Sequence, residues 1–158
     1  MRTILKYLGL VIIMTMIGFV IRNYFFELSL SQIANNNVEV VSRNMSGQFQ
    51  SHIIFALTIG ILPLLYLIIE KITKLEFIKK GLIACGILIT SGVVLWQFRI
   101  YQLNTEVQKL SEYNITNDFK MSLDYEILNF DRFLFFGFLI GTIISILIFR
   151  NRKKNHAE

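Results

Sequence analysis

Four long apolar runs, separated by polar segments, constrain the fold of this chain more than any other feature. They cover about residues 4–25, 53–69, 81–98 and 133–149. Each run is close to the ~17–25 residues that a helix needs to cross the hydrocarbon core of a membrane. With 54% hydrophobic residues among 158, the chain is also too apolar for an ordinary soluble domain. We therefore expect an all-α membrane protein, a bundle of four transmembrane helices that forms one integral membrane domain over residues 1–158.

The basic residues predict how this bundle is oriented. Ten of the sixteen Lys and Arg residues lie in segments 1–6, 70–80 and 150–158. Such an excess is typical of cytoplasmic loops, so we expect both termini and the 70–80 loop in the cytoplasm. Segments 26–52 and 99–132 then become outer loops. Because this distribution explains the positive net charge, it argues against nucleic-acid binding. The abundance of Ile and Asn favours a bacterial plasma membrane, that is, a cell inner membrane.

The second outer loop contains a regular alternation of apolar and polar residues. This period of two predicts a strand with one apolar face, which would have to be covered and could recognise a partner. The apolar residues of this expected recognition face are Phe119, Met121, Leu123, Tyr125 and Ile127. The first loop alternates more weakly, from Phe26 to Leu30 and again from Val38 to Val40, and its spacing also fits a helix. We expect a small extracytoplasmic β element from the two loops, antiparallel or mixed.

The third span is expected to continue beyond the membrane as a helix. Apolar residues recur at intervals of three and four, which is the spacing of one helix face. They are Ile100, Leu103, Val107 and Leu110. This spacing predicts that the helix ends near Glu112.

Two features inside the spans predict how the helices pack. Gly137, Gly141 and Ser145 form a row of small residues that lets two helices approach closely, either within one chain or between chains of an oligomer. Pro63 is the only proline and lies in the middle of the second span. A proline at this place removes one backbone hydrogen bond and is expected to kink the helix.

Several charged or titratable residues lie near the outer ends of the spans. They are Arg22, His52, Arg99 and Arg132. Around the mouth of a bundle these residues could attract an anionic headgroup or ligand. They could equally be interfacial anchors whose side chains extend toward water, so both interpretations remain open.

The motifs of common catalytic and cofactor sites are absent from the sequence. There is no His/Cys cluster, no Gly-rich phosphate loop and no nucleophile motif, and Cys85 is the only cysteine. The size and topology are similar to those of lipoprotein signal peptidases. That family has aspartates in asparagine-rich motifs at the outer ends of its last two spans. Here residues 95–99 contain no aspartate and Asp131 stands alone, so the activity is not inferred.

These observations favour a protein that is not an enzyme and that has no catalytic residues, metal or cofactor. The leading hypothesis is an accessory or interaction component that contacts a partner protein through its outer loops. An oligomeric pore built from the small-residue faces of spans three and four is the first alternative. A membrane-embedded hydrolase is the second, with Asp131 or His52 as acid or base. The expected partners are the lipid bilayer and a protein, either a different one or further copies of this chain.

Overall fold

The computed structural model describes residues 2–33, 38–41, 45–73, 80–113 and 121–154. Most of these residues are helical. In chain order the elements are α1 (Arg2–Ser31), β1 (Val38–Val41), α2 (Met45–Gly60), α3 (Leu62–Thr73), α4 (Leu82–Tyr113), β2 (Met121–Asp124), α5 (Tyr125–Leu128) and α6 (Phe130–Lys154).

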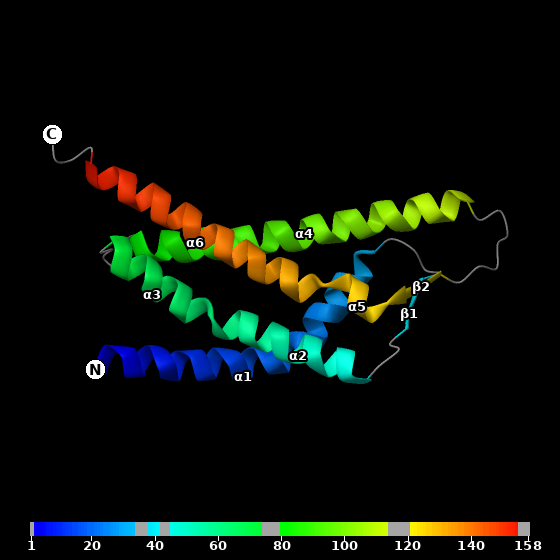
Figure 1. The fold of residues 1–158 in the computed structure, drawn as a ribbon, viewed down its shortest axis with the longest axis horizontal. Coiled ribbons are helices and arrows are strands. Elements are labelled where there is room, and N and C mark those ends of the chain that lie inside the picture. Colours follow the sequence, from blue (N-terminus) through cyan, green and yellow to red (C-terminus); the bar gives the residue numbers. More distant parts are fainter. Residues whose placement is uncertain (1, 34–37, 42–44, 74–79, 114–120, 155–158) are drawn as a thin grey trace.

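Four helical stretches are long and apolar enough to cross a membrane. They are Leu5–Ser31, Gly47–Thr73, Leu82–Lys109 and Phe130–Arg150, and the second is made of α2 and α3 together. The prediction of a multipass helical protein with four spans is therefore confirmed at this level. The start of α1 and the end of α6 lie at the same end of the bundle, beside the end of α3 and the start of α4 (Figure 1). We call this end the terminal end.

The helices α4 and α6 form the most extensive interface in the bundle. Their backbones meet where Gly137 of α6 faces Gly92 of α4. A Cβ atom built at Gly137 would lie 2.5 Å from the Gly92 Cα and 2.6 Å from the Ser91 carbonyl oxygen. The Ser91 hydroxyl donates a hydrogen bond of 2.7 Å to the Gly137 carbonyl across this contact. Small residues thus permit both the close approach and the interhelical hydrogen bond.

A second close pair, α1 and α2, is built in the same way. A Cβ at Gly18 would lie 3.0 Å from the Ala56 Cα, and a Cβ at Gly60 would collide with the Thr15 side chain. Around these contacts Phe25 of α1 stacks on Phe55 of α2, with 4.6 Å between ring centroids. The first pair of helices is therefore held by small residues in its middle and by aromatic rings toward the end opposite the termini.

The second span is interrupted between α2 and α3. α2 ends at Gly60 and α3 begins at Leu62, with Pro63 as its second residue. The Ile61 amide still donates to the Leu57 carbonyl, whereas Pro63 has no amide hydrogen to continue the pattern. Beyond this break α3 packs mainly on α6, while α2 packs mainly on α1. The second span therefore crosses from one helix pair to the other.

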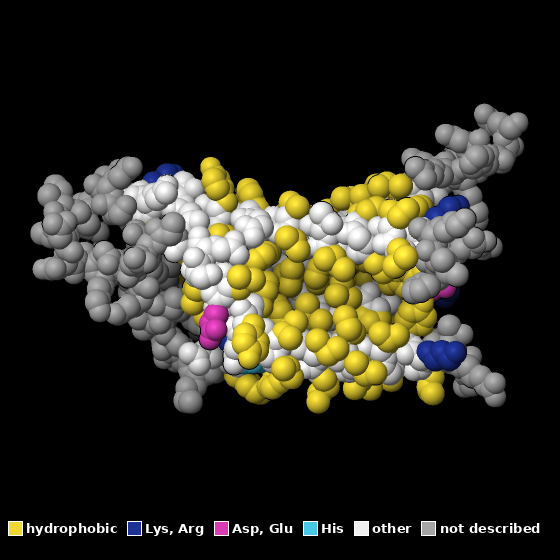
Figure 2. Space-filling model, turned by 180° about the vertical axis from the view of Figure 1, so that it is seen from behind, with side chains coloured by type: hydrophobic (Ala, Val, Ile, Leu, Met, Phe, Trp, Pro, Cys, Tyr) yellow, Lys and Arg dark blue, Asp and Glu magenta, His cyan; other side chains and the backbone are white. Residues whose placement is uncertain are grey.

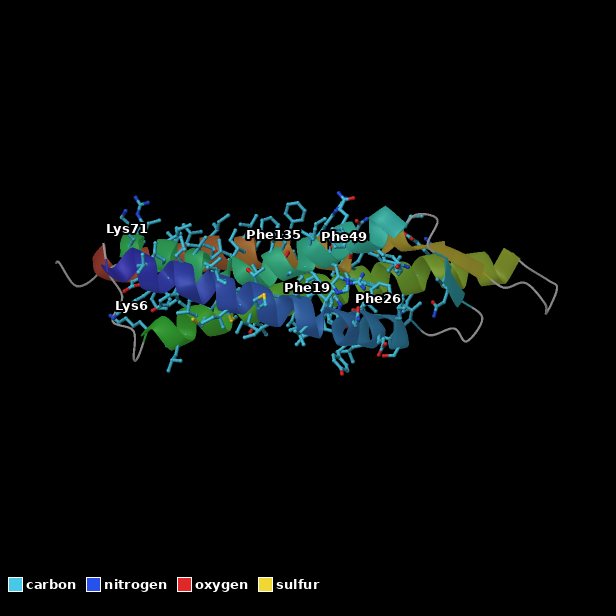
Figure 3. All side chains as sticks on the ribbon, turned by 90° about the horizontal axis from the view of Figure 1, so that it is seen from below. Lys6, Phe19, Phe26, Phe49, Lys71 and Phe135 are labelled. Atoms are coloured by element: carbon cyan, nitrogen blue, oxygen red, sulfur yellow. The ribbon has the colours of Figure 1, made fainter. Side chains whose placement is uncertain are left out.

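The outside of the bundle is apolar over its middle. Figure 2 shows hydrophobic side chains as a continuous band on one face, with Lys and Arg at its ends. On α6, Phe136, Ile143 and Leu147 are all more than half exposed. Phe135 also points away from the bundle (Figure 3). Such a surface fits contact with lipid and not with water.

The helices α1 and α4 are longer than a membrane crossing requires, and they build a folded region at the end opposite the termini. The 32 residues of α4 span about 48 Å at ~1.5 Å per residue, against a hydrocarbon thickness of ~30 Å. The prediction that this helix continues to about Glu112 is confirmed. We call the region formed by residues 29–33, 38–41, 99–113 and 121–128 the cap. Its apolar centre contains Ile33, Leu103, Val107 and Leu128, all less than 10% exposed.

Polar contacts also join the parts of the cap. Trp96 donates its indole N–H to the Ser29 hydroxyl over 3.0 Å, and Asn104 donates to the Gln32 carbonyl over 3.1 Å. Both bonds connect α4 with the end of α1. The cap is therefore held to the bundle by the two helices that enter it.

The strand prediction for residues 119–127 requires correction. Among the described residues of this segment, Met121–Asp124 are extended, whereas Tyr125 and Ile127 belong to the short helix α5. Phe119 lies outside the described residues. β2 pairs with β1 in parallel, with Val38 opposite Met121, whereas an antiparallel or mixed sheet was expected. Because the helix begins at Tyr125, the five apolar residues do not share one strand face, and the predicted β element is not confirmed.

The expectation of extended structure from Phe26 to Leu30 is wrong, because α1 continues as a helix to Ser31. The reason is visible at Ser29, which is fully buried. Its hydroxyl donates to the Phe25 carbonyl one turn earlier and accepts from Trp96. A serine that satisfies its hydroxyl in this way can lie on the inner face of a helix, so the polar residue that suggested an alternation belongs to the core.

Candidate functional site

A buried charged cluster joins three helices where the bundle meets the cap. Arg22 of α1 and Asp131 of α6 are each only 7% exposed, and Ser51 of α2 lies between them. The guanidinium donates a long hydrogen bond of 3.4 Å to the Ser51 hydroxyl, which donates in turn to the Asp131 carboxylate. A cavity of about 20 Å³ beside the three groups has room for one water molecule. We call these residues the Arg22–Ser51–Asp131 cluster.

Local backbone structure explains why Asp131 points into the bundle. Asn129, between α5 and α6, has a φ of 49°, a left-handed conformation that asparagine tolerates better than most residues. Its carbonyl accepts from the Phe133 amide and so begins the first turn of α6. Asp131 lies in that turn, where its carboxylate accepts from the Arg132 amide over 2.9 Å. A carboxylate at a helix N-terminus is further stabilised by the helix dipole.

The guanidinium of Arg22 is satisfied by groups around it as well as by Ser51. It donates to the Asn23 side-chain oxygen over 3.3 Å and lies 4.9 Å from the centroid of the Phe26 ring. Asp131 supplies the opposite charge in its surroundings. A buried charge without such compensation would be very costly, so this arrangement makes the position of Arg22 between the helices tenable.

His52 and Arg132 lie at the edge of the cluster. The imidazole of His52 packs on Phe19, with 4.9 Å between ring centroids. Arg132 is exposed and, together with Ser51 and Asp131, lines an open recess of about 270 Å³ between α2 and α6. The structure therefore brings Arg22, His52 and Arg132 into one region of the bundle, next to the cap.

Arg99, the fourth residue expected at the mouth, has a different environment. Its guanidinium donates to the carbonyls of Ile127 and Leu128, over 2.6 Å and 3.1 Å, and lies over the Phe133 ring. These carbonyls end α5 and would otherwise lack helical partners. Arg99 thus fastens α5 to α4 and does not line the recess.

The small-residue row of α6 faces α4 within the same chain. Gly137 meets Gly92, a Cβ at Gly141 would meet Ser91 and Leu88, and Ser145 is fully buried. The small residues of α6 therefore contact α4 of the same chain.

No sequence pattern singled out Ser51 as the residue between Arg22 and Asp131. A signal was present, because both charged residues precede or end an apolar run on the same side of the expected membrane. What the sequence does not contain is the rotation of each helix, which decides whether these side chains face the bundle or the solvent. In the described part of the chain no group of three or more His, Cys, Asp or Glu residues could hold a metal ion.

The chemistry available at the Arg22–Ser51–Asp131 cluster is electrostatic. A buried cation and a buried anion, bridged by a hydroxyl, fix the relative positions of α1, α2 and α6. Next to them, the open recess presents the Arg132 side chain. Comparisons with known protein families, with characterised proteins and with solved structures found no match, so what is established for this chain is a helical architecture with four helices long and apolar enough to span a membrane.

Proposed function

We propose that this protein is a non-enzymatic integral component of a plasma membrane, a bacterial inner membrane, whose extracytoplasmic cap presents a surface to a partner protein. The observation that carries the proposal is the two-sided extension of α4. Its inner side, with Ile100, Leu103 and Val107, is buried in the cap. Its other side is exposed at Tyr101, Glu106 and Lys109. A helix fixed on one side and bare on the other is a rigid surface for recognition.

Tyr101 is the centre of this proposed surface. Its side chain is 69% exposed, and large aromatic residues are enriched among those that dominate protein interfaces. Seven residues earlier on the same face, Val94 is 58% exposed at the level of the apolar band. One face of α4 would thus meet lipid near Val94 and protein near Tyr101.

A photoreactive amino acid placed at residue 101 or residue 94 tests this proposal in the native membrane. We expect a discrete protein adduct from residue 101 and only lipid adducts from residue 94, because the two positions share a helix face and differ in depth. The gently solubilised particle should contain a second protein in fixed ratio, and Tyr101→Ala should reduce that ratio while Val94→Ala leaves it unchanged. A particle with the mass of one chain and no protein adduct at residue 101 would refute the proposal.

We infer that the terminal end faces the cytoplasm. Four spans return the chain to its starting side, and exposed Lys6, Lys71, Lys80 and Arg150 gather there. Lys6 and Lys71 are seen at this end in Figure 3. An excess of basic residues favours the cytoplasmic side.

Single cysteines at positions 71 and 106, in a chain with Cys85→Ser, test the orientation. Both native side chains, Lys71 and Glu106, are exposed. An impermeant thiol reagent should label residue 106 on intact cells and residue 71 only after permeabilisation. The opposite pattern would place the termini outside the cell and the cap in the cytoplasm, and so contradict the proposal.

The two alternatives have less support. A pore built from the small-residue faces of spans three and four would need those faces free, whereas Gly92 and Gly137 pack against each other within the chain. A hydrolase would need a carboxylate or imidazole open to substrate, and Asp131 is engaged by Ser51 and by the Arg132 amide.

A further inference from the structure

An apolar groove lies between α1 and α4 in the half of the bundle nearest the termini. Its volume is about 760 Å³, within the range of about 300–1,000 Å³ that is typical of small-molecule sites. Leu10 and Met14 of α1 form one wall, Leu88 and Ile89 of α4 form the other, and Pro63 and Tyr66 of α3 form the floor. Lys6 and Tyr7 lie at the mouth of the groove, toward the terminal end.

The course of the helices explains the groove. α1 and α4 meet at the cap end, where Trp96 binds Ser29, and they diverge toward the terminal end (Figure 1). Beyond the break before Pro63, α3 packs mainly on α6, so the described part of the chain leaves the widening space open. α1 is accordingly the least buried of the four spans. The divergence and the break together create the groove.

At its terminal end, the groove is bounded by a contact between α1 and α3. Along its side it is open to the outside of the bundle. The Tyr7 hydroxyl donates a hydrogen bond of 2.5 Å to the Glu70 carboxylate, which brings α1 back to α3. Above this contact the walls belong to segments that are apolar enough to lie within a membrane. These apolar walls fit a hydrocarbon chain that enters from the bilayer.

We propose that this groove binds one anionic phospholipid, with an acyl chain between α1 and α4 and the phosphate at Lys6. Charge complementarity favours the anionic headgroup, since Lys6 lines the mouth itself and exposed Lys71 and Lys80 lie at the same end. Glu70 is an acidic residue near the mouth that would repel a phosphate. Its carboxylate accepts the hydrogen bond from Tyr7, which partly offsets this repulsion. Basic residues at the level of headgroups attract anionic lipids in this way.

Cys85, the only cysteine of the chain, lines the groove and reports its occupancy. The experiment measures the rate at which the purified, delipidated full-length protein reacts with N-ethylmaleimide. Phosphatidylglycerol and phosphatidylcholine with identical acyl chains are added in parallel. We expect phosphatidylglycerol to slow the reaction several-fold and phosphatidylcholine to have little effect. Native mass spectrometry should show one phosphatidylglycerol molecule retained per chain.

Two variants separate a specific site from general solvation by lipid. Lys6→Gln should abolish the difference between the two lipids, whereas Lys109→Gln, at an exposed lysine near the opposite end, should preserve it. Met14→Trp fills the groove and leaves Lys6 in place. This variant should retain less lipid than the wild type.

Three outcomes would overturn the proposal. Equal protection by both lipids would mean that the groove is filled by bulk lipid only. If Cys85 is protected increasingly as the protein concentration rises, and the particle mass doubles, the occupant is a second copy of the chain. No protection by lipid, together with no retained phosphatidylglycerol, would mean that the groove binds none.

Discussion

Replacing Asp131 by alanine is expected to lower the free energy of unfolding by about 1–3 kcal/mol, because it removes a buried acceptor and the negative charge near the buried Arg22 guanidinium. The change also removes the acceptor of the Ser51 hydroxyl and of the Arg132 amide. The measurement is reversible unfolding in detergent micelles, followed by circular dichroism. Glu27→Ala, at an exposed acidic residue of α1, is the matched control and should change little.

Two further variants test the cause of this expected loss. Asp131→Asn keeps an acceptor oxygen but removes the charge, so its effect should be intermediate between that of alanine and wild type. The double variant Arg22→Met/Asp131→Leu should recover much of the lost stability, because no uncompensated charge remains. If Asp131→Ala and Glu27→Ala have equal effects, the cluster contributes nothing to stability.

The second large effect is expected at Gly137. Gly137→Ala places a methyl group against the Gly92 Cα and the Ser91 carbonyl, and backbone atoms cannot move aside as a flexible side chain would. The helices must separate, which also weakens the bond from the Ser91 hydroxyl to the Gly137 carbonyl. We expect a destabilisation of about 1–3 kcal/mol, measured by the same unfolding experiment.

Gly86, on α4, provides a control of the opposite sign. A Cβ built there meets nothing within 4 Å, so Gly86→Ala should be neutral or stabilising by up to about 1 kcal/mol, the difference in helix propensity. The larger substitution Gly141→Leu should destabilise at least as much as Gly137→Ala. Equal effects of alanine at residues 86 and 137 would contradict the close backbone contact between α4 and α6.

The spans could be predicted from the sequence because membrane crossing depends on length and polarity alone. The continuation of α4 to Tyr113 was also predictable, since Ile100, Leu103 and Val107 repeat with the period of a helix. Periodicity failed around Ser29, where a local hydrogen bond and Trp96 allow a serine in the core. It failed again at Tyr125, where an alternating pattern continues past the point at which the backbone turns into α5.

The site was harder to predict than the spans. Arg22 and Arg132 were identified as mouth residues from their positions, but their surroundings depend on how each helix is rotated. Arg99 illustrates the difference, because its side chain turns to the carbonyls of α5. The groove could not be foreseen at all. It depends on the angle between α1 and α4, which no single apolar run encodes.

The Arg22–Ser51–Asp131 cluster has a consequence for the order in which the contacts of the bundle form during synthesis. Arg22 and Ser51 lie in the first two spans, which are neighbours in the sequence and pack as a pair. Asp131 belongs to α6, the last of the four apolar helices. Until α6 is in place, Arg22 has its contacts with Asn23, Phe26 and Ser51 in the first pair of helices, but not the nearby carboxylate of α6. The polar contacts that join α1, α2 and α6 are therefore complete only once α6 has packed against the first pair.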